Sequence, residues 1–305
     1  MGPVIAFDRV SKRIRESEIL EQVSFHVHEH DVFGYLGPNG AGKTTSIRIL
    51  LGLLRPTSGE VRCCGCSGSL PDKLGFVLEH PGLYLNLTAR ENLEFFDRLH
   101  NDSEGRKQRL QDWLGQVGLS HASEKPAWEL SRGMKTRLCI ARAMIANPTL
   151  LVLDEPMSGL DPEGQNEMKV LIRQVARGAT VFMSSHLLSD VQELCNRVAI
   201  LNKRLLVCGP IADITKMEGE ERLRFTTDKN EQELAPFQKQ ILQLPSVESV
   251  DCEANWLEVC LAKDADSQAI IKLLVDNGVN IHEMTRPKQT LEEVYLRLLD
   301  EDRDG

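Results

Sequence analysis

A glycine-rich turn between an apolar run and a helical pattern is the feature that most constrains the fold of this chain. The stretch VFGYLGPNGAGKTTSIRIL fits the pattern G-x-x-x-x-G-K-[ST] from Gly37 to Thr44. Its glycines let the backbone curl so that successive N–H groups point into one concavity, and the helix that follows adds its positive end. The stretch therefore predicts a phosphate-binding loop between a buried strand and a helix.

The side chains of this loop indicate which phosphates it holds. Lys43 supplies a point charge for the β- and γ-phosphates of a nucleotide, and Thr44 supplies a hydroxyl for Mg²⁺. We therefore expect a bound nucleoside triphosphate with Mg²⁺. The loop residues expected to contact the nucleotide are Gly37, Pro38, Asn39, Gly40, Ala41, Gly42, Lys43, Thr44 and Thr45.

A second apolar run, LLVLDEP, ends in the acidic pair Asp154 and Glu155. Asp154 is suited to hold the water shell of Mg²⁺, whereas Glu155, one residue on and so turned differently, is suited to polarise an attacking water. Acidic residues also close strands for purely structural reasons. Because the same chain also contains the phosphate loop, we favour a functional role for this pair.

Alternating strand and helix patterns fill the first two-thirds of the chain. The apolar runs VFGYLG, TLLVLDEP, ATVFMSS and AILNKRLLVCG are predicted as strands, and helical patterns follow the first three. Such alternation indicates buried parallel strands in an α/β domain, which we place at residues 1–216. A mostly helical stretch at about residues 81–147 predicts an inserted helical lobe.

Helix-start signals mark this lobe. Thr88, with Glu91 three residues later, fits a capping box. In ELSRGMKTRL, Ser131 can cap a helix whose apolar stripe begins at Met134 and Leu138.

The pattern changes after residue 216. Residues 217–305 contain strand, helix, strand, strand, helix and strand patterns in that order, which predicts a small α+β ferredoxin-like domain. A last helix, TLEEVYLRLL, opens with Thr290 and Glu293 as a second capping box. An accessory or regulatory role is expected for this domain, through dimer contact, binding of a regulator or stabilisation.

Composition restricts the kinds of partner and the cellular location that we expect for this chain. No window approaches the roughly 18 apolar residues of a membrane span, and MGPVIAFDRV lacks the features of a signal peptide, so we expect a cytoplasmic protein. The net charge of −9 argues against a nucleic-acid partner. The eight cysteines are interpreted as reduced thiols. CCGC, and the alternating His26, His28 and His30, could in principle hold a metal, but a non-metal interpretation is favoured for both.

Five motifs together resemble those of an ABC-type ATPase over residues 1 to about 215. GPNGAGKTT at 37–45, LSRGM at 130–134, LLVLDE at 150–155, SGLD at 158–161 and His186 after VFMSS follow that family's order and spacing. The LSRGM segment separates the family from other phosphate-loop NTPases. GFVLEHPGLY, LSRGMKTRLCIARA and TLEEVYLRLL are similar to the ATP-binding subunits of ABC-2 type exporters, including the bacitracin and lantibiotic self-protection group.

The resemblance implies a phosphate-loop NTPase fold, ATP and Mg²⁺ as cofactors, and ATP hydrolysis that powers export of a small molecule, peptide or lipid-like substrate through a separate ABC-2 type permease. It also implies a head-to-tail dimer, either of two identical chains or with a paralogous ATPase, at the inner face of the cell membrane. Within that dimer Ser131, Gly133 and Met134 would form the signature loop, His186 would touch the γ-phosphate, and Asp161 would link the two sites.

Three residues depart from the family pattern. Glu79 replaces a glutamine, and its carboxylate can still reach Mg²⁺ but adds negative charge. Ile14 falls near the usual adenine-stacking aromatic residue, which predicts weak discrimination between ATP and GTP. Arg132 replaces a signature glycine, and its guanidinium is expected either to contact a phosphate or to face solvent.

The main alternative function is a soluble ABC-type clamp acting on ribosomes or nucleic acid. Such proteins usually carry two cassettes or a long coiled-coil insertion, and the sequence shows neither. A cassette that binds without hydrolysing is disfavoured because Lys43, Asp154, Glu155 and His186 are all present.

Overall fold

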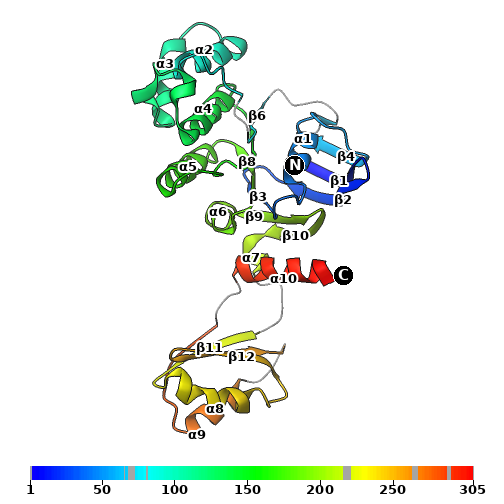
Figure 1. The fold of residues 1–305 in the computed structure, drawn as a ribbon, viewed down its shortest axis with the longest axis vertical. Helices are drawn as coiled ribbons and strands as arrows, with labels where there is room; N and C mark the ends of the chain where they lie inside the picture. The colour runs from blue at the N-terminus through cyan, green and yellow to red at the C-terminus, as the bar shows by residue number, and fades with distance from the viewer. Residues whose placement is uncertain are drawn as a thin grey trace. The chain divides into compact units, whose positions relative to one another are not determined.

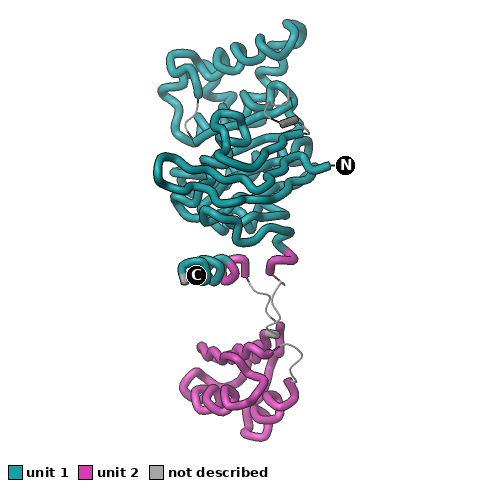
Figure 2. The backbone as a smooth tube through the Cα atoms, turned by 90° about the vertical axis from the view of Figure 1, so that its right-hand side faces the viewer, with its two compact units in different colours: residues 1–211, 295–305 teal, residues 212–294 magenta. Residues whose placement is uncertain are grey.

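A computed structural model gives the fold of the chain (Figure 1) and describes residues 2–64, 66–67, 73–79, 82–215, 221–262, 267–286 and 290–304. Of residues 66, 67, 221 and 304 it describes only the backbone. The chain divides into two compact units, one of residues 1–211 with 295–305 and one of residues 212–294 (Figure 2). This division differs from the sequence-based domains of residues 1–216 and 217–305 in two respects: the boundary follows residue 211, and residues 295–305 belong to the first unit.

A six-stranded sheet forms the centre of the first unit, in the order β10-β9-β3-β8-β7-β6. The neighbours from β9 to β6 are parallel, whereas β10 is antiparallel to β9. The parallel strands bring the segments that follow β3, β7 and β8 to one edge of the sheet. The strands are β3 (Val32–Leu36), β6 (Leu74–Val77), β7 (Leu150–Leu153), β8 (Thr180–Ser185), β9 (Arg197–Asn202) and β10 (Arg204–Pro210).

One predicted strand of this sheet is wrong. The run from residue 199 to 209, interpreted as a single strand, is an antiparallel hairpin in which Lys203 alone separates β9 from β10. Lys203 reverses the chain with a left-handed backbone, φ 57°. Because neither Gly nor Pro marks the reversal, the apolar residues on both sides read as one strand.

A four-stranded antiparallel sheet, in the order β2-β1-β4-β5, packs on the central sheet through aromatic rings. Phe25 stacks on Phe7 with ring centroids 4.6 Å apart and also lies 5.6 Å from Phe33 of β3. The buried face of helix α1 belongs to the same core. These elements are β1 (Ile5–Ile14), β2 (Ser17–Val27), β4 (Ser58–Cys63), β5 (Cys66–Ser67) and α1 (Lys43–Leu50).

The predicted helical lobe lies within residues 82–147 and is visible as a separate group of helices in Figure 1. The capping box is confirmed, because Thr88 Oγ1 accepts the N–H of Glu91 while the Glu91 carboxylate accepts the N–H of Thr88. Buried Asp97 accepts hydrogen bonds from Arg106 and Arg109, which ties α2 to α3. The lobe contains α2 (Ala89–His100), α3 (Arg106–Gln116), the 3-10 turns η1 (Ser120–Ala122) and η2 (Ala127–Glu129), and α4 (Arg132–Met144).

Four further helices complete the described helices of residues 1–215 and 290–304. The capping box at Thr290 and Glu293 is confirmed by reciprocal hydrogen bonds. None of the described helices is both long and apolar enough to span a membrane. The four are α5 (Pro162–Val175), α6 (Leu188–Leu194), α7 (Ile211–Ile214) and α10 (Leu291–Asp304).

The second unit has the predicted ferredoxin-like order of elements. Its four strands form one antiparallel sheet in the order β12-β13-β11-β14. Buried residues of this sheet, such as Phe225 and Val259, pack with Leu234 of α8 and Leu274 of α9 into a separate core. The elements are β11 (Glu221–Thr227), α8 (Glu231–Ile241), β12 (Val247–Glu253), β13 (Trp256–Leu261), α9 (Gln268–Asp276) and β14 (Ile281–Thr285).

Candidate active site

The glycine-rich loop runs from the end of β3 into α1 and can be built only with glycine at its tight points. Gly42 has φ 100°, and a Cβ there would lie 2.5 Å from Leu20 Cδ2. A Cβ on Gly37 would lie 2.3 Å from the carbonyl oxygen of Leu201. No side chain caps α1 at Gly42. The first N–H groups of α1 therefore form a ready anion site.

Lys43 lies inside this loop. Its Nζ donates hydrogen bonds to the carbonyl oxygens of Gly37 at 2.7 Å and Pro38 at 3.2 Å. The same Nζ is 3.2 Å from Glu155 Oε1, and the Lys43 side chain is only 6% exposed. An ammonium group in the concavity of the loop offers the charge that a phosphate group requires.

Asp154 directly follows β7 and is almost fully buried. Its Oδ1 accepts hydrogen bonds from Ser184 Oγ at 2.7 Å and Thr44 Oγ1 at 3.4 Å. Within the described part of the chain, its Oδ2 is buried and accepts no hydrogen bond. A buried carboxylate oxygen without a donor, beside a threonine hydroxyl, fits a Mg²⁺ ion.

The ionisation of Asp154 reflects this environment. Burial raises the pKa of the Asp154 carboxyl, and the negative charges of Glu155 and Glu79 add to the rise. Hydrogen bonds from Ser184 and Thr44 lower the same pKa in part. Glu79, which is exposed just after β6, is therefore close enough to Asp154 to act on it electrostatically.

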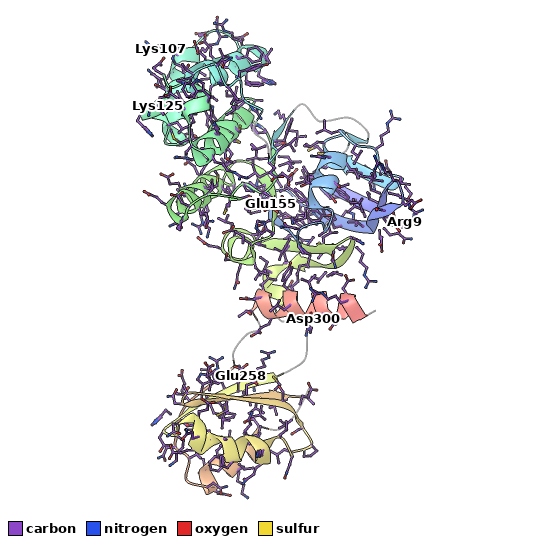
Figure 3. All side chains as sticks on the ribbon, in the orientation of Figure 1. Arg9, Lys107, Lys125, Glu155, Glu258 and Asp300 are labelled. Atoms are coloured by element: carbon purple, nitrogen blue, oxygen red, sulfur yellow. The ribbon has the colours of Figure 1, made fainter. Side chains whose placement is uncertain are left out.

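Glu155 has a left-handed backbone, φ 49°, which is uncommon for a residue other than glycine. Its N–H donates to Ser184 Oγ at 2.8 Å, and its Oε2 lies 2.8 Å from His186 Nδ1. Lys43 holds the other carboxylate oxygen. Glu155, labelled in Figure 3, is thus fixed through its backbone and both oxygens beside the central sheet.

Ser184 was missed by the sequence reasoning. It is fully buried in β8, and its hydroxyl joins Asp154 Oδ1 to the N–H of Glu155. The available signal was the pair of serines that ends the apolar run VFMSS, since polar residues in a buried strand require partners.

The predicted signature residues lie apart from this cluster, with no hydrogen bond or ion pair to it among the described residues. Exposed Ser131 caps α4, and its Oγ accepts the N–H of Met134 at 3.2 Å. Asp161 caps α5 by accepting the N–H of Gly164 at 3.2 Å. Gly133 faces Leu160, whose Cδ2 would lie 3.3 Å from an added Cβ.

Arg132 packs on the loop that precedes Asp161. Its Nη1 would lie 2.5 Å from a Cβ on Gly159, and its Nη2 is 3.4 Å from Ser158 Oγ. The N–H of Ser158 in turn donates to the carbonyl of Glu155 at 3.1 Å. Arg132 therefore connects the segment around Ser131 to the segment that carries Glu155.

The position expected to stack on the nucleotide base carries no aromatic ring. Ile14 ends β1 and is 46% exposed, which leaves an aliphatic side chain at the position expected for a stacking ring. Of the two metal alternatives considered, CCGC includes Gly65, which lies outside the described residues. No group of three or more His, Cys, Asp or Glu residues suited to a metal occurs in the described ranges.

Comparison with known sequences identifies the class of protein to which this nucleotide site belongs. The family described as ABC transporter matches residues 20–158. The chain is 32% identical over 306 residues to the bacitracin transport ATP-binding protein BcrA of Bacillus licheniformis, and the match covers 98% of each chain. It is 33% identical over 313 residues to the uncharacterized ABC transporter ATP-binding protein YhcH of Bacillus subtilis, covering 100% of this chain and 98% of that one. The chain therefore belongs to the ATP-binding subunits of ABC transporters.

Solved structures agree with this assignment. The structure titled as the ATP-binding subunit of an ABC transporter matches with a TM-score of 0.63 and 27% identity, covering 70% of this chain and 92% of the other. A dimeric, post-hydrolysis structure of the ATP-binding cassette MJ0796 with ADP and Pi matches with a TM-score of 0.61 and 25% identity, covering 68% and 98%. The predicted ATPase class and the predicted resemblance to the bacitracin group are confirmed.

Proposed function

We propose that this chain powers export through a separate membrane permease of the ABC-2 type, from the cytoplasmic face of the membrane. The observation that carries this proposal is the similarity to a bacitracin transport ATP-binding protein over 98% of both chains, which includes the second unit. The alternative of a soluble clamp is not favoured, since the relatives compared above are named as transport subunits.

Six side chains of the site support a role in ATP hydrolysis. Lys43 exchanges its contact with Glu155 for the β- and γ-phosphates when nucleotide binds. Glu155 then orients the attacking water and accepts its proton, and His186, which is 2.8 Å from Glu155, contacts the γ-phosphate. Asp154 and Thr44, with Glu79 nearby, would hold Mg²⁺. The ion when bound neutralises phosphate charge.

A head-to-tail dimer would complete each site. The start of α4 at Ser131, Gly133 and Met134 is the positive end of a helix, which suits a phosphate, although Ser131 Oγ already accepts the N–H of Met134. This chain already has a phosphate loop of its own. We assign these residues to the nucleotide of a partner ATPase, either an identical chain or a paralogue, with Asp161 between the two sites.

A groove beside β6 is the proposed contact with the permease. A cavity of about 300 Å³ is lined by residues that include Phe76, Phe96 and Arg142. Exposed apolar side chains lie on neighbouring segments of the helical lobe, where Leu85 is 52% and Leu99 is 64% exposed. Exposed apolar groups on a lobe that also lines a groove suit an apolar segment of a membrane partner.

The catalytic assignment is tested with Glu155→Gln. This variant should bind ATP, form a stable dimer in size-exclusion chromatography and hydrolyse less than about 1% of the wild-type amount, a loss typical of a missing general base. Hydrolysis by Glu155→Gln at the wild-type rate would contradict the role of Glu155.

The permease assignment is tested by searching the neighbouring reading frames for a multi-span membrane protein and co-expressing that protein with this chain. Leu99→Glu should abolish co-purification with that membrane protein and leave the ATPase activity of the isolated subunit unchanged. Val170→Glu is the matched control, because Val170 is 61% exposed on α5. Equal loss with both variants would show that the helical lobe is not the contact.

A further inference from the structure

The last turns of α10 contribute a carboxylate to the hairpin between β9 and β10. Asp302 Oδ1 accepts a hydrogen bond from Arg204 Nε at 2.5 Å, and Oδ2 accepts one from Asn202 Nδ2 at 2.7 Å. The Asp302 side chain is only 10% exposed. Its two donors flank Lys203, the one residue between the strands, so a single carboxylate holds both sides of the hairpin tip.

The same hairpin tip supports the phosphate loop. The N–H of Lys203 donates to the carbonyl oxygen of Ala41, inside the loop, at 3.0 Å. The carbonyl oxygen of Lys203 accepts the N–H of Glu21 at 2.9 Å. The adjacent strand approaches the loop so closely that Gly37 has no room for a side chain beside Leu201. The hairpin therefore forms one wall of the loop.

Lys203 requires outside support to keep this position. Its left-handed backbone, φ 57°, is unfavourable for a residue with a Cβ and persists only where surrounding contacts fix it. The side chains on either side of it, Asn202 and Arg204, are the ones that Asp302 holds. Loss of Asp302 therefore frees both neighbours of a residue with a strained backbone.

We propose that Asp302 is a positioning residue for nucleotide binding. Through Asn202 and Arg204 it keeps the N–H of Lys203 directed at Ala41, so that the phosphate loop is preformed before the nucleotide arrives. A preformed loop binds more tightly because less ordering accompanies binding.

The proposal predicts an effect on affinity rather than on chemistry. Arg204 is 53% exposed, so solvent weakens its ion pair with Asp302. The contact acts mainly because one carboxylate accepts hydrogen bonds from two side chains, and the expected effect is therefore moderate. For Asp302→Ala in the full chain, the Kd and KM for ATP should rise about three- to tenfold with little change in kcat, in the range of couplings carried through neighbouring side chains. Amide hydrogen exchange at Lys203 should become faster.

Asp300→Ala is the matched control. Asp300 lies on the same helix, is exposed, and faces only Arg303, at 3.4 Å, among the contacts described for it. This variant should keep the wild-type KM and exchange. The double variant Asp302→Arg with Arg204→Asp should recover most of the lost affinity, because the Asn202 amide can present its oxygen to the new arginine.

Three results would overturn the proposal. One is a folded Asp302→Ala variant with unchanged KM and unchanged exchange at Lys203. Another is an equal rise in KM for Asp300→Ala. The third is a lower melting temperature of Asp302→Ala with wild-type affinity, which would make the contact structural only. In each case ATP hydrolysis itself would persist, so failure here is distinct from failure of the proposed transport function.

Discussion

Removing the Ser184 hydroxyl should slow hydrolysis far more than it weakens nucleotide binding. This buried hydroxyl donates to Asp154 Oδ1 at 2.7 Å and accepts the N–H of Glu155 at 2.8 Å. Ser184→Ala leaves that N–H without its acceptor and takes a donor from a buried carboxylate. Leaving a buried polar group unsatisfied costs about 1–3 kcal/mol. Because Glu155 is partly reached by solvent, we take about 2 kcal/mol for the combined loss.

If that free energy is lost in the transition state, kcat falls about thirtyfold, since each 1.36 kcal/mol is a factor of ten. Steady-state ATPase assays over a range of ATP and Mg²⁺ concentrations measure kcat and KM separately. Ser184→Thr keeps the hydroxyl on a side chain that suits a strand, and should retain most of the activity. Wild-type kcat in Ser184→Ala, or an equal loss in Ser184→Thr, would refute the bridging role.

Three further predictions concern the stability of the helical lobe, the choice between ATP and GTP, and the composition of the dimer site. Asp97→Asn should lower the free energy of unfolding by about 2 kcal/mol at pH 7, because two arginines lose a buried charge. Burial opposes ionisation of Asp97, yet hydrogen bonds from these arginines lower its pKa below the usual value. The stabilisation is therefore present above the pKa of Asp97 in the unfolded chain, and it is lost as the pH falls through the lower pKa of the folded chain. Chemical denaturation at pH values from 7 to 3 measures this loss. Because Ile14 stands where an aromatic ring would stack on adenine, the chain should bind ATP and GTP with similar Kd values. A tenfold preference for ATP in calorimetry would contradict this. A mixed dimer of a Lys43→Ala chain and a Ser131→Arg chain should keep one intact site and trap one nucleotide, whereas loss of both sites would place Ser131 in its own chain's site.

Local chemistry explains what could be predicted from the sequence. The phosphate loop, the acidic pair after β7 and the caps at Thr88, Ser131 and Thr290 each depend on residues within a few positions of one another. Such segments adopt nearly the same conformation wherever the fold places them. The βαββαβ order was likewise readable from the pattern of apolar residues.

Contacts between distant segments could not be predicted in the same way. Ser184 reaches Asp154 because β8 pairs in parallel with β7, and the sequence does not reveal that register. Asp302 meets Arg204 across 98 positions of sequence. The reversal at Lys203 has no glycine signal, since its left-handed backbone is maintained by tertiary contacts.

The charges of the site indicate how nucleotide enters it. Asp154, Glu155 and Glu79 bring three carboxylates near one ammonium group, that of Lys43. A triphosphate alone would add further negative charge to a region in which burial already raises the pKa of Asp154. Lys43 would also have to leave Glu155, so that carboxylate would lose its counterion. We therefore propose that a cation enters together with the nucleotide, with the buried Oδ2 of Asp154 as the oxygen that would receive it.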